Sequence, residues 1–200
     1  MVASTQAATT TVMPASLQSL EHNVTEGHMS NIQIVTPCLW FDHQAEEAAL
    51  FYTSIFHNSR IVHISRYGEA GHEIHGKPAG TVMAVAFELS GQAFTALNGG
   101  PAFKFNEAIS FQVSCDTQDE VDHYWNKLSQ GGDETAQQCG WLKDKYGVSW
   151  QIIPHVLLEM LSDPDIEKSQ RVTTAMLQMK QLNIDALKQA YGNSTVATGI

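Results

Sequence analysis

The hydrophobic pattern of the chain begins at Asn31, where NIQIVTPCLWF has the apolar and β-branched residues typical of a strand. Small and aromatic residues then recur at spacings of three and four, which predicts a helix with one packing face. Asp42 is placed to cap this helix, and Glu46 and Glu47 lie in its first turn, where negative charge is favourable. The packing positions are Ala45, Ala48, Ala49, Tyr52 and Phe56. SRIVHISRY, TVMAVAFELS and QAFTALN are predicted to follow as strands, with a turn at Gly91.

The same order of patterns then returns. EAISFQVSC predicts a strand, and Thr117 and Glu120 form a T-x-x-E capping box at the start of a second helix. Its predicted buried face is Val121, Tyr124, Trp125 and Leu128, and Gly131-Gly132 ends it. A strand around Ala136 to Leu142, a DKYG turn and the strand VSWQIIP complete the copy. A single β-α-β-β unit cannot bury its sheet face alone, so the two copies are expected to pack together.

Beyond Pro154 the pattern becomes helical. Asp163 is predicted to cap a helix with Pro164 at its first position, and Asn183 to cap a last short helix closed by Gly192. The resulting domain boundaries are a core domain over residues 31–155, with modules at about 31–100 and 106–155, a helical extension over 156–192 and a frayed tail over 193–200. Residues 1–30 are rich in Ala, Ser and Thr and lack Lys and Arg, which predicts a disordered extension rather than a targeting signal.

Charge and cysteine content narrow the possible partners. The formal net charge is −10, which argues against nucleic-acid binding because that affinity depends on Lys and Arg. The chain has no apolar run of the ~20 residues that a membrane span requires. Its three cysteines form no CxxC pair, so reduced thiols in a cytoplasmic protein are expected.

Three stretches carry a resemblance to a known family: TPCLWFDHQAEEAALFYTSIF, NGGPAFKFNEAISF and CGWLKDKYGVSWQIIP. They are similar to the vicinal oxygen chelate superfamily, which includes glyoxalase I, extradiol dioxygenases and bleomycin resistance proteins. Within it the chain most resembles the PhnB-like family, often labelled 3-demethylubiquinone-9 3-methyltransferase. The resemblance implies an α+β fold in which paired βαβββ modules form a curled mixed sheet around a cleft, commonly in a homodimer.

The resemblance also identifies the positions where metal-dependent relatives place their ligands. The equivalents are Thr36, a residue near Asn98, either Ala108 or Ser110, and Gln151, the last within the DKYGVSWQ match. None is His, Asp or Glu, the ligands that such transition-metal sites require. We therefore expect neither the usual metal nor another cofactor.

Other candidate ligands and catalysts are less favoured by their sequence context. His72, Glu73 and His75 form HExH rather than the zinc-binding HExxH, and their glycine-flanked segment is predicted to be a mobile loop. His43, His57 and His123 are interpreted as surface or core histidines. The cysteines at 38, 115 and 139 are interpreted as structural. Gly99-Gly100 precedes PAFKF rather than a helix, which argues against a nucleoside-binding turn and hence against methyl transfer.

Strand alternation predicts which side chains line the cleft. Ile109, Phe111 and Val113 would pack under the helices, and Ser149 and Ile153 would share the face of Gln151. The candidate ligand-binding residues are Cys38, Trp40, Asn98, Phe103, Phe105, Ser110, Gln112, Trp141 and Gln151. Aromatic walls with a few neutral polar groups are typical of small-molecule pockets. The alternative interpretation is that these residues only fill and satisfy a sheet core.

Three functional hypotheses follow. The first is a protein that binds or transforms a small, partly apolar molecule without the usual metal. The second is a metal-dependent lyase, isomerase or dioxygenase of the glyoxalase type with displaced ligands such as His63 or His72. The third is a dimeric structural module without catalytic activity. The sequence does not decide whether the chain is an enzyme.

Overall fold

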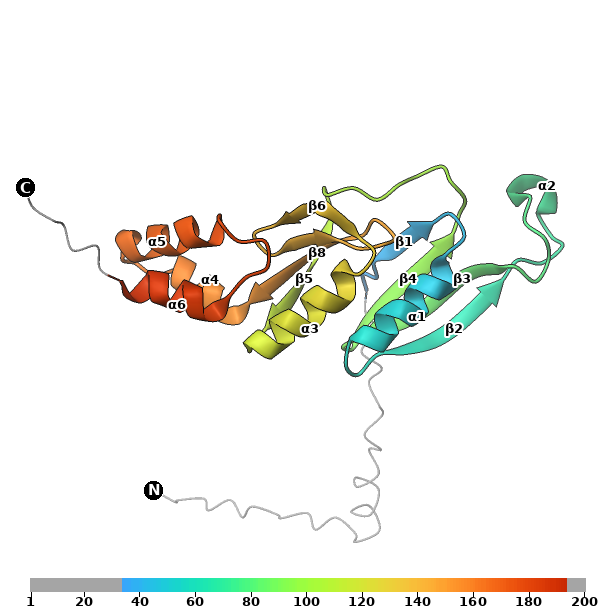
Figure 1. Ribbon diagram of the computed structural model, residues 1–200. Helices are drawn as coiled ribbons and strands as arrows, with labels where there is room; N and C mark the ends of the chain where they lie inside the picture. Colours follow the sequence, from blue (N-terminus) through green and yellow to red (C-terminus); the bar gives the residue numbers. More distant parts are fainter. Residues whose placement is uncertain (1–33, 194–200) are drawn as a thin grey trace, which may run out of the picture. The chain divides into compact units, whose positions relative to one another are not determined.

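The first module follows the predicted order of strands and helix. The computed structural model describes residues 34–193 (Figure 1), so the predicted extension over 1–30 and most of the tail over 193–200 lie outside the described residues. The residues from Thr36 onward form one compact unit. Its first module consists of β1 (Cys38–Phe41), α1 (Ala45–Ile55), β2 (Arg60–Arg66), α2 (His72–His75), β3 (Val82–Leu89) and β4 (Gln92–Asn98).

The second module repeats this arrangement without a counterpart of α2. Its elements are β5 (Ser110–Cys115), α3 (Gln118–Ser129), β6 (Asp133–Gln138), β7 (Trp141–Lys143) and β8 (Ser149–Pro154). The strand orders are β1-β4-β3-β2 and β5-β8-β7-β6, which are the same order in the two sheets. The strand β1 pairs parallel with β4, and β5 pairs parallel with β8. The remaining strand pairs are antiparallel. The predicted twofold βαβββ repeat in an α+β fold is therefore confirmed.

Each sheet has a helix-facing side and an opposite side, which we call its open face. In β4, Phe94, Ala96 and Asn98 are buried, whereas the alternate residues between them are only half-buried. In β8, Trp150 and Ile152 are buried on the helix-facing side, so Gln151 lies on the open face. The helices α1 and α3 each pack against their own module's sheet (Figure 1).

One apolar core extends through both modules. Phe94 of β4 meets Phe111 of β5 with ring centroids 5.2 Å apart, and Phe56 stacks on Tyr124 of α3 at 5.0 Å. At the centre, the hydroxyl of Tyr52 in α1 donates to Asp144 Oδ2 over 2.7 Å. The core thus fixes the two sheets relative to each other.

A helical extension continues directly from β8. It comprises α4 (His155–Leu161), α5 (Ile166–Met176) and α6 (Ile184–Gly192), which enclose a separate small core that includes Leu157, Val172 and Leu187. The extension is tied to the β6–β7 turn, where the backbone N–H groups of Cys139 and Gly140 donate to the carbonyls of residues 179 and 180. Within residues 34–193, no helix is both long and apolar enough to span a membrane.

Helix starts agree with the sequence where the cap is local. The capping box of Thr117 and Glu120 is present, and Asn183 caps α6 as predicted. The prediction for Asp42 was wrong, because the first N–H of α1 at Ala45 instead donates to the side chain of Asn98 over 2.8 Å. The prediction for Asp163 was also wrong.

Asp165 is the residue that caps α5. Its carboxylate accepts hydrogen bonds from the N–H groups of Glu167 and Lys168. Pro164 therefore precedes the helix rather than opening it. Asp163 accepts bonds from the N–H of Asp165 and from the hydroxyl of Tyr191 in α6. Asp163, two residues before this cap, thus links the start of α5 to α6.

Several predicted boundaries were also wrong. The first strand begins at Cys38, after residues 34–37 without strand structure, and residues 31–33 lie outside the described part. The strand predicted around 136–142 is interrupted by a turn, in which Cys139 has φ 53° and Gly140 φ 85°. Ile109 precedes β5 and is 74% exposed rather than packed under a helix. The predicted loop around His72 contains the one-turn helix α2.

Candidate functional site

Asp144 joins the two modules through its buried carboxylate. Its carboxylate accepts bonds from Tyr52, from the indole N–H of Trp150 over 2.9 Å, and from the backbone N–H groups of Tyr146 and Val148. Burial raises the pKa of Asp144 despite these opposing hydrogen bonds. With four donors around a buried carboxylate, Asp144 is a structural residue that shapes the 144–147 turn.

The open face of the first sheet is built mainly from small and apolar side chains. Register aligns Cys38 with Thr95 and Ala86 in one row, and Trp40 with Leu97 and Ala84 in the next. On β2, His63 continues the row of Ala86, and Ser65 continues the row of Ala84. The first open face is therefore Cys38, Trp40, His63, Ser65, Ala84, Ala86, Thr95 and Leu97. Burial raises the pKa of the Cys38 thiol, so Cys38 is poorly suited as a nucleophile at neutral pH.

The open face of the second sheet is polar. Its central row aligns Gln112, Gln151 and Trp141, and the neighbouring row aligns Ser110, Ser149 and Lys143. The second open face is therefore Ser110, Gln112, Trp141, Lys143, Ser149 and Gln151. The Gln112 amide donates to Gln151 Oε1 over 3.2 Å, and the Gln151 amide donates to Ser110 Oγ over 2.7 Å. We call these three residues the amide ladder.

An aromatic cavity of about 300 Å³ lies between the end of β1, the linker between the modules (residues 99–109) and the 144–147 turn. Phe103 contacts Trp40 edge to face at 5.0 Å, and Phe105 contacts Phe41 at 5.2 Å. The cavity is lined by Trp40, Phe41, Asp42, Gln44, Phe103, Lys104, Phe105, Tyr146 and Gly147. The aromatic part of its lining suits an apolar group.

Trp40 is fixed in this cavity by two features of the backbone. Its indole N–H donates to the carbonyl of Gly100 over 2.8 Å. A Cβ atom at Gly99 would lie 2.1 Å from the Trp40 ring, so only glycine allows the indole to pack against this backbone. Gly99 and Gly100 therefore hold the Trp40 indole in place on one side of the cavity. Glycine is needed because the ring lies so close to the backbone.

The predicted site residues do not all lie together. Trp40, Phe103 and Phe105 line the aromatic cavity, whereas Ser110, Gln112, Trp141 and Gln151 belong to the second open face, and Cys38 to the first. Asn98 is buried on the helix-facing side, where its amide caps α1 and donates to the carbonyl of Val82 over 3.0 Å.

The sequence interpretation overlooked Lys143 and Glu107. Lys143 lies two residues after Trp141, so strand alternation could have assigned it to the second open face. The two side chains form an ion pair. This contact joins β7 to the linker, and no local pattern predicts it.

The residues at the expected metal positions do not fit a transition metal. Ser110 and Gln151 offer neutral oxygens and Asn98 is engaged as a cap. Within residues 34–193, no three His, Cys, Asp or Glu side chains gather in a way that could hold an ion. In the HEIH segment, His75 Nδ1 accepts from the Lys77 N–H and Nε2 lies 3.3 Å from the Ala70 carbonyl. Both ring nitrogens of His75 are thus occupied by the backbone.

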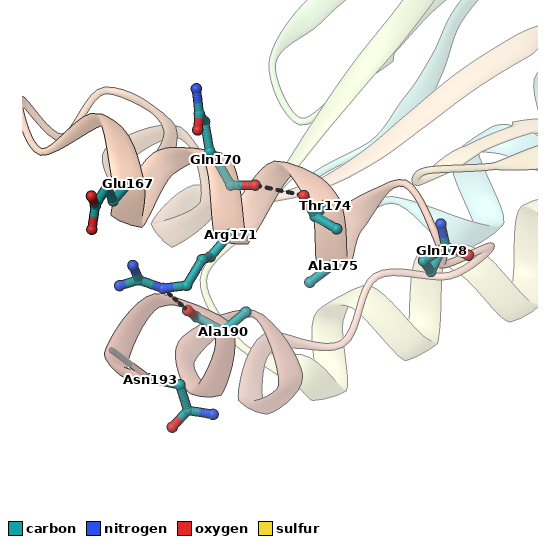
Figure 2. Close-up of a pocket in the computed structure, with 8 residues that line it drawn as sticks. All are labelled: Glu167, Gln170, Arg171, Thr174, Ala175, Gln178, Ala190 and Asn193. Atoms are coloured by element: carbon teal, nitrogen blue, oxygen red, sulfur yellow. Dashed lines mark hydrogen bonds between the residues drawn. The ribbon is translucent and has the colours of Figure 1, made fainter. Parts of the chain in front are cut away.

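A second hollow, of about 600 Å³, lies between α5 and α6 (Figure 2). The guanidinium of Arg171 donates to the carbonyls of Ala190 and Tyr191 over 3.0 Å each. Arg171 thereby satisfies carbonyls at the C-terminal end of α6, a structural role.

Comparison with known families now identifies the relationship. Residues 33–153 match the family described as 3-demethylubiquinone-9 3-methyltransferase. The chain belongs to this family. A Bacillus cereus PhnB protein with the same description is 41% identical to this PhnB-like chain; the match covers 61% of this chain and 99% of the other, with a TM-score of 0.52. The extension α4–α6 lies beyond the matched residues.

Two further solved structures are similar to the chain at lower TM-scores. A Staphylococcus aureus protein is 30% identical over 58% of this chain and 92% of that chain, with a TM-score of 0.26. The fosfomycin resistance protein FosX from Listeria monocytogenes is 13% identical over 63% and 95%, with a TM-score of 0.41. The fold likeness of this PhnB-like chain rests on the Bacillus cereus PhnB structure, whose TM-score exceeds 0.5. The comparison with curated proteins gives no match.

Proposed function

We propose that this PhnB-like protein binds a small, partly apolar molecule through its aromatic cavity and the second open face. The observation that carries the proposal is the amide ladder. The resemblance implies that Gln151 is the equivalent of a ligand position in metal-dependent relatives, yet its amide bonds to Gln112 and Ser110. Hydrogen bonds from these neutral groups would take the place of metal coordination.

The amide ladder keeps capacity for a ligand. Each glutamine amide has two donors and an acceptor oxygen, and the two ladder bonds use one donor from each. Ser110 Oγ accepts in the ladder, so its hydroxyl hydrogen is available to donate. A few oriented polar groups together with an aromatic cavity would provide both orientation and apolar contact area.

We further propose that the protein is a homodimer in which a second copy completes the site. Trp40 and Leu97 are only partly buried on the first open face, and a partner's sheet would remove such apolar surface from water. Sedimentation at micromolar concentration should give the mass of a dimer. A monomer that still binds a ligand would contradict this part of the proposal.

The other functions receive less support from the site. A glyoxalase-type metal enzyme would need ligands other than the neutral groups of the amide ladder. His63 was one such candidate, but its partner across the sheet is Ala86, which cannot bind a metal. Methyl transfer is named in the family's description. We do not propose it here, because neither strand order is that of a doubly wound nucleotide-binding sheet.

The proposal can be tested by titrating ¹⁵N-labelled protein with a library of small, partly apolar molecules. Ligands should shift the side-chain amide signals of Gln112 and Gln151, and Gln151→Met should weaken binding by roughly tenfold. Gln92→Ala, an exposed change at the start of β4, is the matched control. Stoichiometric iron, manganese, nickel or zinc in protein purified without chelator would overturn the proposal.

A further inference from the structure

The second open face contains a buried hydroxyl without a partner. Ser149 is only 2% exposed, and among the described residues its Oγ is the buried side-chain polar atom that makes no hydrogen bond. A buried polar group normally finds a partner, because desolvation without a hydrogen bond is costly. An unsatisfied hydroxyl on a face that is proposed to bind a ligand indicates that the ligand supplies the missing partner.

Register places two further donors beside Ser149. Ser110 on β5 and Lys143 on β7 are its direct neighbours across the sheet, and neighbouring strands lie about 4.8 Å apart. Ser110 Oγ accepts from Gln151, so its hydroxyl hydrogen remains available to donate. We call Ser110, Ser149 and Lys143 the donor row. Two hydroxyls and an ammonium in line would suit a group that carries acceptor oxygens and a negative charge.

The protein's own linker already provides such a group. The carboxylate of Glu107 pairs with the ammonium of Lys143. The Glu107 side chain is 58% exposed, whereas the Lys143 side chain is 22% exposed, so the carboxylate can swing into solvent while the ammonium stays in place. Lys143 holds the pKa of Glu107 below its usual value, which keeps Glu107 ionised at neutral pH.

The charges around Lys143 limit the ligand to a small negative charge. Asp133 stands opposite Lys143 in register, and its Oδ1 accepts from the N–H and hydroxyl of Thr135. With one ammonium and an acidic neighbour, the row suits a single carboxylate better than a doubly charged phosphate. The linker that carries Glu107 also carries Phe103 and Phe105, which line the aromatic cavity.

We propose that the donor row binds the carboxylate of a small aromatic or aliphatic acid and that Glu107 holds this position in the free protein. Binding exchanges one Lys143–carboxylate pair for another and gives Ser149 its missing partner. The inference rests on the proposed function, since it assigns a ligand class to the same site. Because Glu107 is tethered, it competes at an effective concentration in the millimolar range.

The closing experiment titrates the full chain with phenylacetate and, in parallel, with phenylacetamide, its uncharged analogue. Phenylacetate should shift the backbone amide signals of Ser149 and Lys143 at lower concentration than phenylacetamide does. Glu107→Gln should tighten phenylacetate binding by about fivefold, because it removes the tethered competitor. Glu134→Gln, an exposed acidic residue on β6, controls for the change in net charge. Lys143→Met should abolish the preference for the acid.

Each outcome decides a different question. Tighter phenylacetate binding in Glu107→Gln but not in Glu134→Gln supports the inference. Equal binding of acid and amide, with shifts in Gln112 and Gln151, overturns the carboxylate assignment and leaves the proposed small-molecule function standing. If neither probe shifts any residue of the second open face or the aromatic cavity, the inference fails, and the library titration then judges the broader proposal.

Discussion

The two modules have the same strand order, but their open faces differ in chemistry. The first presents mainly small and apolar side chains such as Ala84, Ala86 and Leu97, whereas the second presents the amide ladder and the donor row. Topology is therefore set by the helix-facing side of each sheet, where buried apolar residues dominate. The other side is free to vary, and function is carried by such side chains rather than by the fold.

The modules also differ in how their helices begin. The helix α3 is capped by the local capping box of Thr117 and Glu120. The helix α1 is capped by Asn98, which is 53 residues away in sequence, at the end of β4. The first helix thus depends on its sheet being formed, whereas the second carries its own start signal.

The largest effect is expected from breaking the join between the modules. Asp144→Ala should lower the free energy of unfolding by about 3 kcal/mol, since it leaves Tyr52, Trp150 and two backbone N–H groups without their acceptor. Urea denaturation measures this change. Asp133→Ala, on the surface of the same module, should cost far less. Equal losses in the two variants would contradict the assignment of Asp144 to the join.

The tertiary cap should matter next. Asn98→Ala should cost about 2 kcal/mol, because it removes the cap of α1 and leaves the Val82 carbonyl without its donor. Hydrogen exchange of the first turn of α1 should accelerate together with that of β3. If exchange increases in α1 alone, Asn98 does not couple the helix to the sheet.

The local cap should contribute less. Thr117→Ala should cost about 1 kcal/mol, the usual value for a lost N-cap, and should affect the first turn of α3. Thermal unfolding of this variant beside Asn98→Ala compares the two modules directly. A larger loss for Thr117→Ala would reverse the proposed difference between them.

These two caps show what the sequence could and could not predict. Thr117 and Glu120 lie three residues apart, so their pairing was readable, as were strand alternation around Gln151 and the twofold repeat. The cap from Asn98 and the ion pair of Glu107 with Lys143 are contacts between distant segments, which no local pattern reveals. The shift of the α5 cap from Asp163 to Asp165 had a further cause, because Asp163 instead holds Tyr191 of α6.

A smaller effect of opposite sign is expected at the donor row. Ser149→Ala should raise the free energy of unfolding by about 1 kcal/mol, since it removes a buried hydroxyl that lacks a partner. The same variant should bind phenylacetate more weakly. Chemical denaturation and the amide titration measure the two effects on one sample. A loss of stability without a change in binding would mean that Ser149 only packs the sheet.

The smallest effect is a difference in thiol reactivity between a cysteine on an open face and a cysteine on a helix-facing side. Cys38 lies on the first open face, whereas Cys115 is buried on the helix-facing side of β5, and burial raises the pKa of Cys115 to about 12. Because a raised pKa leaves little thiolate, Cys115 should react with iodoacetamide at least about tenfold more slowly than Cys38 at pH 8. Mass spectrometry of timed samples measures both rates. Equal rates would contradict the assignment of these faces.

The central claim is that neutral groups of the second open face hold an organic ligand where metal-dependent relatives hold an ion. The most direct test is a crystal structure of protein isolated from its own cells without chelator, with anomalous data collected. We expect density for an organic molecule in contact with Gln151 and no anomalous peak beside it. An anomalous peak coordinated by Gln151 or Ser110 would mean that an ion, and not an organic ligand, is held there.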